Sequence, residues 1–258
     1  MLTSAKKKPN VQARTRLDSL LVERGVVDSR VRAQALIMAG EVLVDDMPIE
    51  KAGTKVLASA SIRLRNEVAN FVSRGGDKID PIFKHFEIDL SNTVAVDIGA
   101  STGGFTHSML QRGARLVYAV DVGYNQLHHR LRCDKRVVVM ERVNAKDLVA
   151  SDFEELPSFA TIDVSFIGLR KIIKPICGIL KTPFSILALV KPQFELEPSY
   201  VSKGGVVRSS ENQLLAVRLV SEFAQELGLN VRGFLPSPIK GAKKGNQEFF
   251  ILMESGGR

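Results

Sequence analysis

The sequence predicts an α/β protein in which a small α+β domain precedes a doubly wound, mostly parallel sheet that ends in an antiparallel hairpin. Three observations predict this fold class. Short helical and strand-like patterns fill residues 14–66. From Ser91 onward, apolar runs recur with helix-like segments between them, which is typical of a parallel sheet covered on both faces. Two further strand-like runs close the chain.

The composition indicates a globular protein with an anionic partner. The chain has 258 residues, of which 45% are hydrophobic and 25% charged, and its formal net charge is +8. Residues 1–76 alone hold 13 Lys and Arg against 8 Asp and Glu. This excess of positive charge favours a polyanion such as nucleic acid, although many basic proteins bind none.

Targeting and redox features predict a cytoplasmic protein. The chain starts with a lysine run but has no apolar signal region, and no run approaches the roughly 18 apolar residues of a membrane span. Cys133 and Cys177 lack the spacing of a metal site or a disulfide framework. We therefore expect no membrane partner and no metal.

The N-terminal part is expected to hold a tail and two short helices. Residues 1–13 are typical of a flexible basic tail. Leucines at helical spacing from Leu17 predict a helix that ends at Gly25. Either Asp28 or Ser29 can cap a second helix, which ends at Gly40. The expected apolar stripe of that second helix consists of Val31, Ala35, Leu36 and Ala39.

Strand-like runs follow in both parts of the chain. Residues 41–46 and 61–65 predict a small β meander after the two helices. The parallel strands are predicted in the apolar runs 93–99, 115–123, 136–140, 159–166 and 184–192. A long amphipathic helix at about 209–227 leads to strands at 229–238 and 246–253, which can pair as a hairpin across the loop between them.

A glycine-rich loop, "VAVDIGASTGGF" at residues 94–105, is the most informative stretch. A buried strand brings Asp97 to its carboxyl end, and Gly99, Gly103 and Gly104 then form a loop that enters a helix. The spacing is D-x-G-x-x-x-G-G, which differs from the dinucleotide pattern G-x-G-x-x-G and is the form met in S-adenosylmethionine sites. Asp97 would face the methionine part of that cofactor or water around it.

Polar side chains after the next two strands support the same cofactor. Asp121 is placed to accept ribose hydroxyls, and Asn144 or Asp147 could face the adenine. The alternative is a glycine turn that packs a helix on the sheet, with Asp121 as a strand-end cap. The predicted cofactor-binding residues are Asp97, Gly99, Ser101, Thr102, Gly103, Gly104, Phe105, Asp121, Val122, Asn144 and Asp147.

Four further residues could carry chemistry. Asp163 follows the fourth strand, and Lys191 follows the fifth, which Pro192 stops. Glu248 stands at the start of the last strand, and Lys78 lies on a helix that leads into the first parallel strand. Each alone has an ordinary explanation as a solvated charge or a strand-end cap. In a doubly wound sheet, however, all four can converge on the cofactor crevice.

Two lysines and two acids beside a methyl donor suit the methylation of a sugar hydroxyl. The hydroxyl must lose its proton, and a lysine can take that proton only when its own ammonium is partly neutral. A second nearby cation favours the neutral form, and the acids would orient the lysines. Positioning for in-line attack would supply much of the rate.

Several motifs resemble one bacterial family. "RLDSLLVERG", "SRVRAQALIMAGEVLV" and "SIRL" resemble the ribosomal-protein-S-four RNA-binding module. "FVSRGGDKI", "DIGASTGGF", "AVDVGYNQL", "IDVSFIGL", "LVKPQFE" and "SPIKGAKKGNQEFF" resemble an FtsJ-type methyltransferase. In this order they are similar to the TlyA-type proteins, often labelled hemolysins, which are ribosomal RNA 2′-O-methyltransferases.

The resemblance implies a fold, roles and a partner. It implies a Rossmann-like methyltransferase domain at 71–258 after an RNA-binding domain at 14–70. The family's Lys-Asp-Lys-Glu catalytic set falls on Lys78, Asp163, Lys191 and Glu248. The implied partner is ribosomal RNA or a ribosomal subunit, and the candidate phosphate contacts are Arg16, Arg30, Arg32 and Arg63.

Three other functions compete with this interpretation. An RNA-binding ribosome-assembly factor without catalysis is the main rival, and the intact set of four residues argues against it. A nicotinamide dehydrogenase is disfavoured by the glycine spacing. A direct membrane-lysing protein would need a spanning or amphipathic element, and no candidate for a span is visible.

Overall fold

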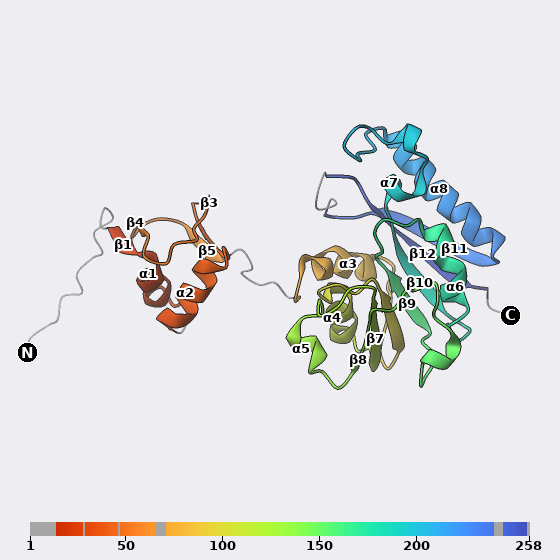
Figure 1. Cartoon of the computed structure of the whole chain (residues 1–258), viewed down its shortest axis with the longest axis horizontal. Coiled ribbons are helices and arrows are strands. Elements are labelled where there is room, and N and C mark those ends of the chain that lie inside the picture. The colour runs from red at the N-terminus through yellow and green to blue at the C-terminus, as the bar shows by residue number, and fades with distance from the viewer. Residues whose placement is uncertain (1–13, 28, 46, 65–70, 240–244, 257–258) are drawn as a thin grey trace, which may run out of the picture. The chain divides into compact units, whose positions relative to one another are not determined.

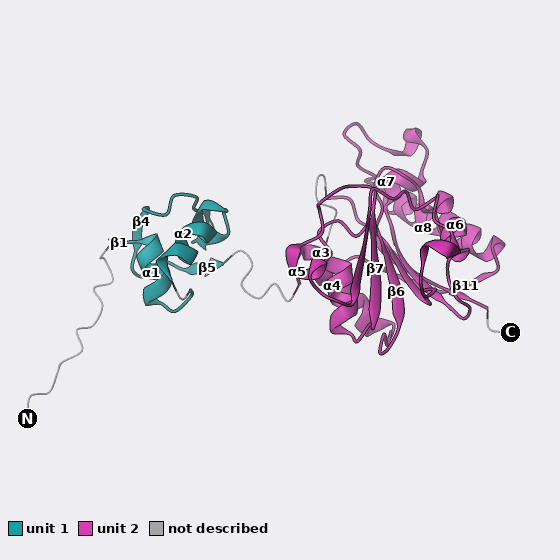
Figure 2. Cartoon of the chain, turned by 60° about the horizontal axis from the view of Figure 1, so that its bottom comes forward, with its two compact units in different colours: residues 1–69 teal, residues 70–258 magenta. Residues whose placement is uncertain are grey.

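The chain forms two compact units that divide between residues 69 and 70, as Figure 2 shows. The computed structural model describes residues 14–27, 29–45, 47–64, 71–239 and 245–256. The expected tail at 1–13 and part of the expected hairpin loop, 240–244, lie outside the described residues. Each unit is considered by itself.

Two helices form the core of the first unit. They are α1 (Leu17–Glu23) and α2 (Arg30–Met38), and both end where predicted, because Gly25 and Gly40 take the positive φ of a helix C-terminus. Ser29 is the N-cap of α2, since its side chain accepts a hydrogen bond from the backbone of Arg32. The core of this unit contains Leu17, Leu20, Leu21, Ala33 and Ile37.

The predicted apolar stripe of α2 is wrong at Val31, Ala35 and Ala39, whereas Leu36 packs against the core as expected. Val31 is 79% exposed, and Ala35 and Ala39 are exposed as well. The buried face of α2 instead presents Ala33 and Ile37 to α1 and the strands. Both sets are spaced by about one helical turn, so spacing alone did not show which face α1 covers.

Short antiparallel strands complete the first unit. The predicted strands are present as β2 (Val42–Val44) and β5 (Ile62–Leu64), which pair with each other, and β3 (Met47–Pro48) pairs with β2. A further pair, β1 (Arg14–Arg16) with β4 (Lys55–Leu57), was not expected from the sequence. It joins the start of α1 to the middle of the meander.

The second unit contains a seven-stranded sheet of order β11-β12-β10-β9-β6-β7-β8. Strands β6 to β10 are parallel neighbours, while β12 runs antiparallel to both β10 and β11. The mostly parallel sheet and the C-terminal hairpin are therefore confirmed. The strands are β6 (Val94–Ile98), β7 (Leu116–Asp121), β8 (Val137–Glu141), β9 (Phe159–Ile162), β10 (Ser185–Val190), β11 (Leu229–Pro236) and β12 (Phe249–Ser255).

Helices cover both faces of this sheet, as Figure 1 shows. On β6, Val94, Val96 and Ile98 face one apolar cluster, and Ala95 faces the other. The first cluster includes residues of α6 (Ile173–Cys177) and α8 (Ser210–Glu226), and the second includes residues of α3 (Arg74–His85) and α4 (Gly104–Gln111). The shorter helices are α5 (His129–Arg132), α7 (Pro192–Glu195) and the 3-10 turns η1 (Ala150–Asp152), η2 (Leu169–Lys171) and η3 (Pro198–Tyr200).

The strand order reverses beside β6. From β6 the chain adds β7 and β8 on one side, and it then returns to place β9 and β10 on the other side. In an open α/β sheet, such a reversal leaves a crevice beyond the carboxyl ends of the two central strands. The glycine loop follows β6, and Asp163 follows β9, so both lie at this crevice.

Candidate active site

A cavity of about 360 Å³ lies at the carboxyl ends of β6, β7 and β9. Its lining is mainly apolar, with a few polar groups, as expected for a site that binds a small organic cofactor. Apolar side chains include Ile98, Val120, Val143 and Ile172, and polar ones include Ser101, Asp121, Asn144 and Ser165. Phe166 also lines this cavity, and its side chain is largely exposed.

A second cavity of about 200 Å³ adjoins the first. The two share Gly99, Ser101 and Asp163 in their linings, so they meet over the glycine loop. The second cavity is more polar. It is lined by the N-cap Ser73 and by Arg74, Gly75 and Lys78 of α3, and by Ala100, Thr102, Gly104 and Phe105 of the loop.

The glycines of the loop are required by close backbone approaches. Gly99 has a φ of +85°, and a Cβ atom there would lie 2.5 Å from the carbonyl oxygen of Asp163. Gly103 has a φ of +95° and is the N-cap of α4. At Gly104, a Cβ atom would lie 2.4 Å from Oγ of Ser73. The absence of side chains thus brings the starts of α3 and α4 together at the polar cavity.

Asp97 does not face either cavity, which corrects the place expected for it. The side chain is fully buried beneath the loop. One carboxylate oxygen accepts hydrogen bonds from the backbone and hydroxyl of Thr106, and the other accepts one from the hydroxyl of Thr161. Burial raises the pKa of Asp97 to about 6. Asp97 therefore ties the first turn of α4 to β9 and supports the loop from below.

Asp121 is at the end of β7 and is partly exposed at the apolar cavity. One of its oxygens accepts a hydrogen bond from the backbone of Ser101 at 2.8 Å, and the other accepts one from Gly123 at 2.7 Å. The carboxylate thereby connects the glycine loop to the turn after β7. Each oxygen keeps further lone pairs, which can accept hydroxyl groups of a ligand.

The remaining predicted cofactor residues fall into two groups. Val122 and Asn144 line the apolar cavity, while the described side chain of Asp147 is exposed outside the lining. Of the two alternatives for the adenine, the structure therefore brings Asn144 to the cavity. Gly103 belongs to the loop but lines neither cavity, and a Cβ atom there would meet the side chains of Leu127 and Leu131.

Lys78 and Glu248 form a buried ion pair. Nζ of Lys78 lies 2.6 Å from Oε2 of Glu248, and both side chains are less than a tenth exposed. Lys78 is held on α3, whose N-terminal turn is capped by Ser73. Glu248 directly precedes β12, and its backbone carbonyl accepts a hydrogen bond from Ser237. The helix and the end of the last strand thus meet at this pair.

Lys191 and Asp163 form a second ion pair. Nζ of Lys191 lies 2.6 Å from Oδ1 of Asp163 and also donates a hydrogen bond to the hydroxyl of Ser165 at 3.0 Å. Lys191 follows β10, and Pro192 begins the short helix α7 directly after it. Ser165 was missed in the sequence. The polar residue two positions after Asp163 in "IDVSF" was the signal available.

The polar cavity brings the two pairs together. Lys78 and Asp163 both line it, Glu248 is bound to Lys78, and Lys191 is bound to Asp163. The four residues come from α3, from the end of β9, from the end of β10 and from the residue before β12. Lys78 and Asp163 therefore meet at one pocket beside the glycine loop, while Glu248 and Lys191 are joined to it through their ion pairs and are not part of its lining.

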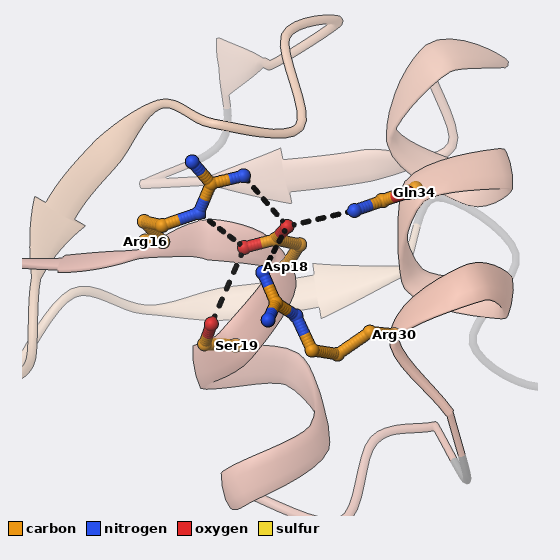
Figure 3. A network of polar contacts seen from close by, with 5 residues as sticks. All are labelled: Arg16, Asp18, Ser19, Arg30 and Gln34. Atoms are coloured by element: carbon orange, nitrogen blue, oxygen red, sulfur yellow. Dashed lines mark hydrogen bonds and ion pairs between the residues drawn. The ribbon is translucent and has the colours of Figure 1, made fainter.

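Two arginines of the first unit bind the same acid. Arg16 and Arg30 both bind the buried carboxylate of Asp18, as Figure 3 shows, while about half of each arginine side chain stays exposed. Arg32 is exposed on α2. Arg63 lies in β5, and its side chain is outside the described part of the structure.

None of the described helices has the length and apolar character needed to span a membrane. The described residues also hold no group of three or more His, Cys, Asp and Glu that could bind a metal ion.

Comparison with known families identifies the chain. Residues 71–255 match the model of the FtsJ-like methyltransferases, and residues 15–62 match the S4 domain. The chain belongs to the FtsJ-like methyltransferase family. It is therefore a methyltransferase whose methyl donor is S-adenosylmethionine, and it carries an S4 domain before the catalytic fold. Membership of this family excludes the alternative function of a nicotinamide dehydrogenase.

Curated relatives are similar over most of the chain. Hemolysin A of Brachyspira hyodysenteriae is 40% identical and covers 91% of this chain and 97% of its own length. The 16S/23S rRNA (cytidine-2′-O)-methyltransferase TlyA of Mycobacterium tuberculosis is 39% identical and covers 94% of this chain and 90% of its own length. The resemblance to TlyA-type proteins is thereby confirmed.

Solved structures share the fold of this family member. A candidate hemolysin from Streptococcus thermophilus is 41% identical, covers 94% of this chain and 88% of its own, and has a TM-score of 0.73. The magnesium protoporphyrin IX methyltransferase of Synechocystis with bound SAH is 10% identical, covers 71% of this chain and 83% of its own, and has a TM-score of 0.50. The second likeness shows the fold alone.

Proposed function

We propose that the chain transfers the methyl group of S-adenosylmethionine to a ribose 2′-hydroxyl of ribosomal RNA. The observation that carries this proposal is the meeting of two lysine–carboxylate pairs, Lys78 with Glu248 and Lys191 with Asp163, at one pocket beside the glycine loop. The relative from Mycobacterium tuberculosis, named as an rRNA (cytidine-2′-O)-methyltransferase, supports the same reaction.

The apolar cavity fits the nucleoside part of the donor. Its aliphatic lining suits a purine ring, and Asn144 and Val122 are also part of that lining. Asp121 offers carboxylate lone pairs to ribose hydroxyls. The bare backbone at Gly99 and Ser101 lets the rest of the donor cross toward the polar cavity, where Thr102, Gly104 and Phe105 also line the wall.

The paired side chains suit the acceptor half of the reaction. S-adenosylmethionine supplies a methyl group carried on a positively charged sulfur. Because the 2′-hydroxyl is a weak nucleophile, it must give up its proton as its oxygen attacks. Glu248 and Asp163 fix the positions of the two lysines. In the reacting state one lysine is the neutral amine, which accepts the hydroxyl proton and becomes an ammonium group, and the other is an ammonium group that binds the oxygen. The bond from the methyl group to sulfur breaks as its bond to the oxygen forms. The fixed positions of the two lysines hold the oxygen in line with the methyl group.

The first unit would bind the RNA backbone. We assign RNA binding to residues 14–70 and methyl transfer to residues 71–258, in agreement with the S4 and FtsJ-like matches. Exposed guanidinium groups are the expected phosphate ligands, because they present several N–H donors in a fixed plane. The candidates are Arg16, Arg30, Arg32 and Arg63.

The partner in the cell would be ribosomal RNA, either free or within a ribosomal subunit. An enzyme with this substrate works where ribosomes are, so we place the chain in the cytoplasm. The hemolysin names belong to the relatives that carry them. The cavity and its two ion pairs favour methyl transfer over lysis.

A methyl-transfer assay tests the proposal. Ribosomal subunits from a host that lacks the protein are incubated with radiolabelled S-adenosylmethionine and wild-type, Lys78→Ala or Lys191→Ala protein. We expect the wild type to label the RNA and to create a new 2′-O-methyl mark, and each variant to lose about 100-fold or more in rate. Binding of S-adenosylmethionine by calorimetry shows whether each variant keeps its donor site.

The rival function gives a different result. An RNA-binding assembly factor without catalysis would bind the subunits and leave no 2′-O-methyl mark. Unchanged rates in both lysine variants would contradict the catalytic assignment, even if the wild type methylates RNA. A methyl mark on a base would contradict the ribose assignment.

A further inference from the structure

A buried carboxylate joins two arginines on the surface of the first unit (Figure 3). Arg16 binds Asp18 with two parallel hydrogen bonds, from Nε to Oδ1 at 3.0 Å and from Nη2 to Oδ2 at 2.9 Å. Arg30 donates from Nη2 to the same Oδ2 at 3.1 Å. Gln34, one turn further along α2, donates to Oδ2 at 3.0 Å. Asp18 thereby links the start of α1 to α2.

Asp18 is ionised in this environment. The hydrogen bonds from Arg16 hold the pKa of its carboxyl well below the usual range, against the effect of burial. A buried carboxylate is stable only when such donors surround it. The same negative charge lets two guanidinium groups lie close together, since without it their positive charges would repel.

The arrangement leaves donors of both arginines for a ligand. The bonds to Asp18 use Nε and Nη2 of Arg16 and only Nη2 of Arg30. The side chain of Arg16 is 48% exposed and that of Arg30 is 57% exposed. The guanidinium of Arg16 also packs over Gly53, where a Cβ atom would lie 3.3 Å from Nη1. Arg16 is thus held by Asp18 and by Gly53, while about half of its side chain stays exposed.

We propose that Asp18 is a positioning residue for RNA binding: it fixes Arg16 and Arg30 side by side, so that together they bind a backbone phosphodiester group. This inference rests on the proposed function, because it assumes that the first unit binds RNA. Free arginine side chains lose rotamer freedom when they bind, whereas a pair already ordered by Asp18 loses less. A phosphodiester has two unbridged oxygens, which match two adjacent guanidinium groups.

The positioning role and the net charge predict opposite effects of Asp18→Asn on RNA affinity. Asp18→Asn removes one negative charge from a basic RNA-binding unit, which by simple electrostatics would tighten RNA binding. The positioning role predicts the opposite. Because asparagine lacks the charge that gathers the two arginines, we expect full-length Asp18→Asn protein to bind unmodified ribosomal RNA about tenfold more weakly than the wild type.

A matched control separates position from charge. Glu23 is an exposed acid at the end of α1, outside the hydrogen bonds to Asp18. Glu23→Gln changes the net charge by the same amount, and we expect it to leave RNA affinity unchanged or slightly increased. Equal or tighter binding by Asp18→Asn relative to Glu23→Gln would overturn the proposal.

The salt dependence of binding separates positioning from loss of fold. If the arginines lose their phosphate contacts, the slope of log affinity against log salt concentration should fall by about one in Asp18→Asn. A variant that merely contains less folded protein would bind fewer molecules with an unchanged slope. Circular dichroism at the assay temperature gives the folded fraction, and a lowered affinity with an unchanged slope contradicts the proposal.

Two further variants distinguish this inference from the proposed function. Arg16→Gln and Arg30→Gln should each weaken RNA binding in the wild-type background, and each should matter less when Asp18→Asn is already present. If neither arginine variant affects RNA binding, the RNA-binding surface proposed for this unit is wrong. If both arginine variants weaken RNA binding, and by the same factor in the wild-type and Asp18→Asn backgrounds, only the positioning role of Asp18 is wrong.

Discussion

Nζ of Lys78 lies 2.6 Å from Oε2 of Glu248, although 170 positions separate the two residues in the chain. Both side chains are almost completely buried. Removing one partner from such a pair leaves an uncompensated charge, which destabilises a protein by about 3–5 kcal/mol. A loss of activity in a single variant could therefore reflect either chemistry or folding.

A double variant resolves this ambiguity. In Lys78→Met with Glu248→Leu, both charges are replaced by apolar groups of similar volume, so we expect stability near that of the wild type. Methyl transfer should still be reduced by about 100-fold or more, because the proposed catalytic lysine is gone. Urea unfolding and the methyl-transfer assay measure the two effects separately. Normal activity in the double variant would remove the pair from the mechanism.

Ser165 should affect the rate of methyl transfer more than donor binding. Its hydroxyl accepts a hydrogen bond from Lys191, which Asp163 also holds. Loss of one hydrogen bond to a charged group costs about 1.5–3 kcal/mol, so Ser165→Ala should lower kcat by about tenfold or more. Ser165→Thr keeps a hydroxyl and should retain most of the activity. Equal kcat values for the two variants would show that the hydroxyl does not position Lys191.

Gly104 should tolerate no side chain. A Cβ atom there would lie 2.4 Å from Oγ of Ser73 and 2.7 Å from the backbone nitrogen of Gly76. Gly104→Ala must therefore push α3 away from α4, and we expect a loss of about 2–3 kcal/mol in unfolding free energy. Binding of S-adenosylmethionine should weaken as well, because the polar cavity lies between these helices.

Gly256→Ala provides the comparison for Gly104. The nearest atom to a Cβ at Gly256 would be 4.0 Å away, so this substitution should change neither stability nor donor binding. Thermal unfolding and calorimetry measure both quantities. A Gly104→Ala protein that matches Gly256→Ala in both would contradict the close packing of the two helices.

Asp97 should make the stability of the protein depend on pH. Burial raises its pKa to about 6 in the folded protein, against a usual value near 4 when unfolded. The folded state therefore binds the proton of Asp97 more tightly than the unfolded state does. The stability that this adds to the folded protein is fully present below about pH 4 and is lost as the pH rises through about 6. The shift corresponds to a difference of roughly 3 kcal/mol.

Comparison with Asp97→Asn isolates this contribution. Asparagine does not titrate, and it can still accept a hydrogen bond from Thr106 and donate one to Thr161. The difference in unfolding free energy between wild type and variant should therefore change with pH between about 4 and about 6. Urea unfolding at several pH values measures this difference in unfolding free energy. A difference that stays constant with pH would show that the pKa of Asp97 is not raised in the folded protein.

The glycine loop and the strand ends show how far sequence patterns reach. Repeated apolar runs with helical segments between them are typical of parallel strands, so the parallel sheet was predicted. The long helix α8 was predicted from its amphipathic spacing, and the C-terminal hairpin from two strand-like runs joined by a loop. Lys191 was placed correctly at the end of β10 because Pro192 cannot continue a strand. On α2, by contrast, the exposed and buried faces have similar apolar spacing, and three of the four residues predicted to be buried are exposed.

In the candidate active site, too, the sequence predicted some features and not others. Asp97 and Asp121 both end a strand in the sequence pattern, yet the structure buries the first under the loop and exposes part of the second. The strand register pairs Asp97 with Ala119, so Asp121 lies on the same face of the sheet but two positions further toward the carboxyl edge. That extra length brings the carboxylate of Asp121 to the cavity, while the loop covers Asp97. The two positions therefore looked equivalent until the strands were packed.

The sequence by itself determined the family, the order of the elements and the residue types that meet at the strand ends. Local patterns specify these features because apolar periodicity, glycine conformations and strand-stopping prolines act over a few residues. Only the tertiary structure decided which carboxylate holds which lysine, that Ser165 joins Lys191, and that Asp18 gathers Arg16 and Arg30. These contacts join residues that are far apart in the chain and depend on how the segments pack, which the spacing of residues in the sequence does not specify.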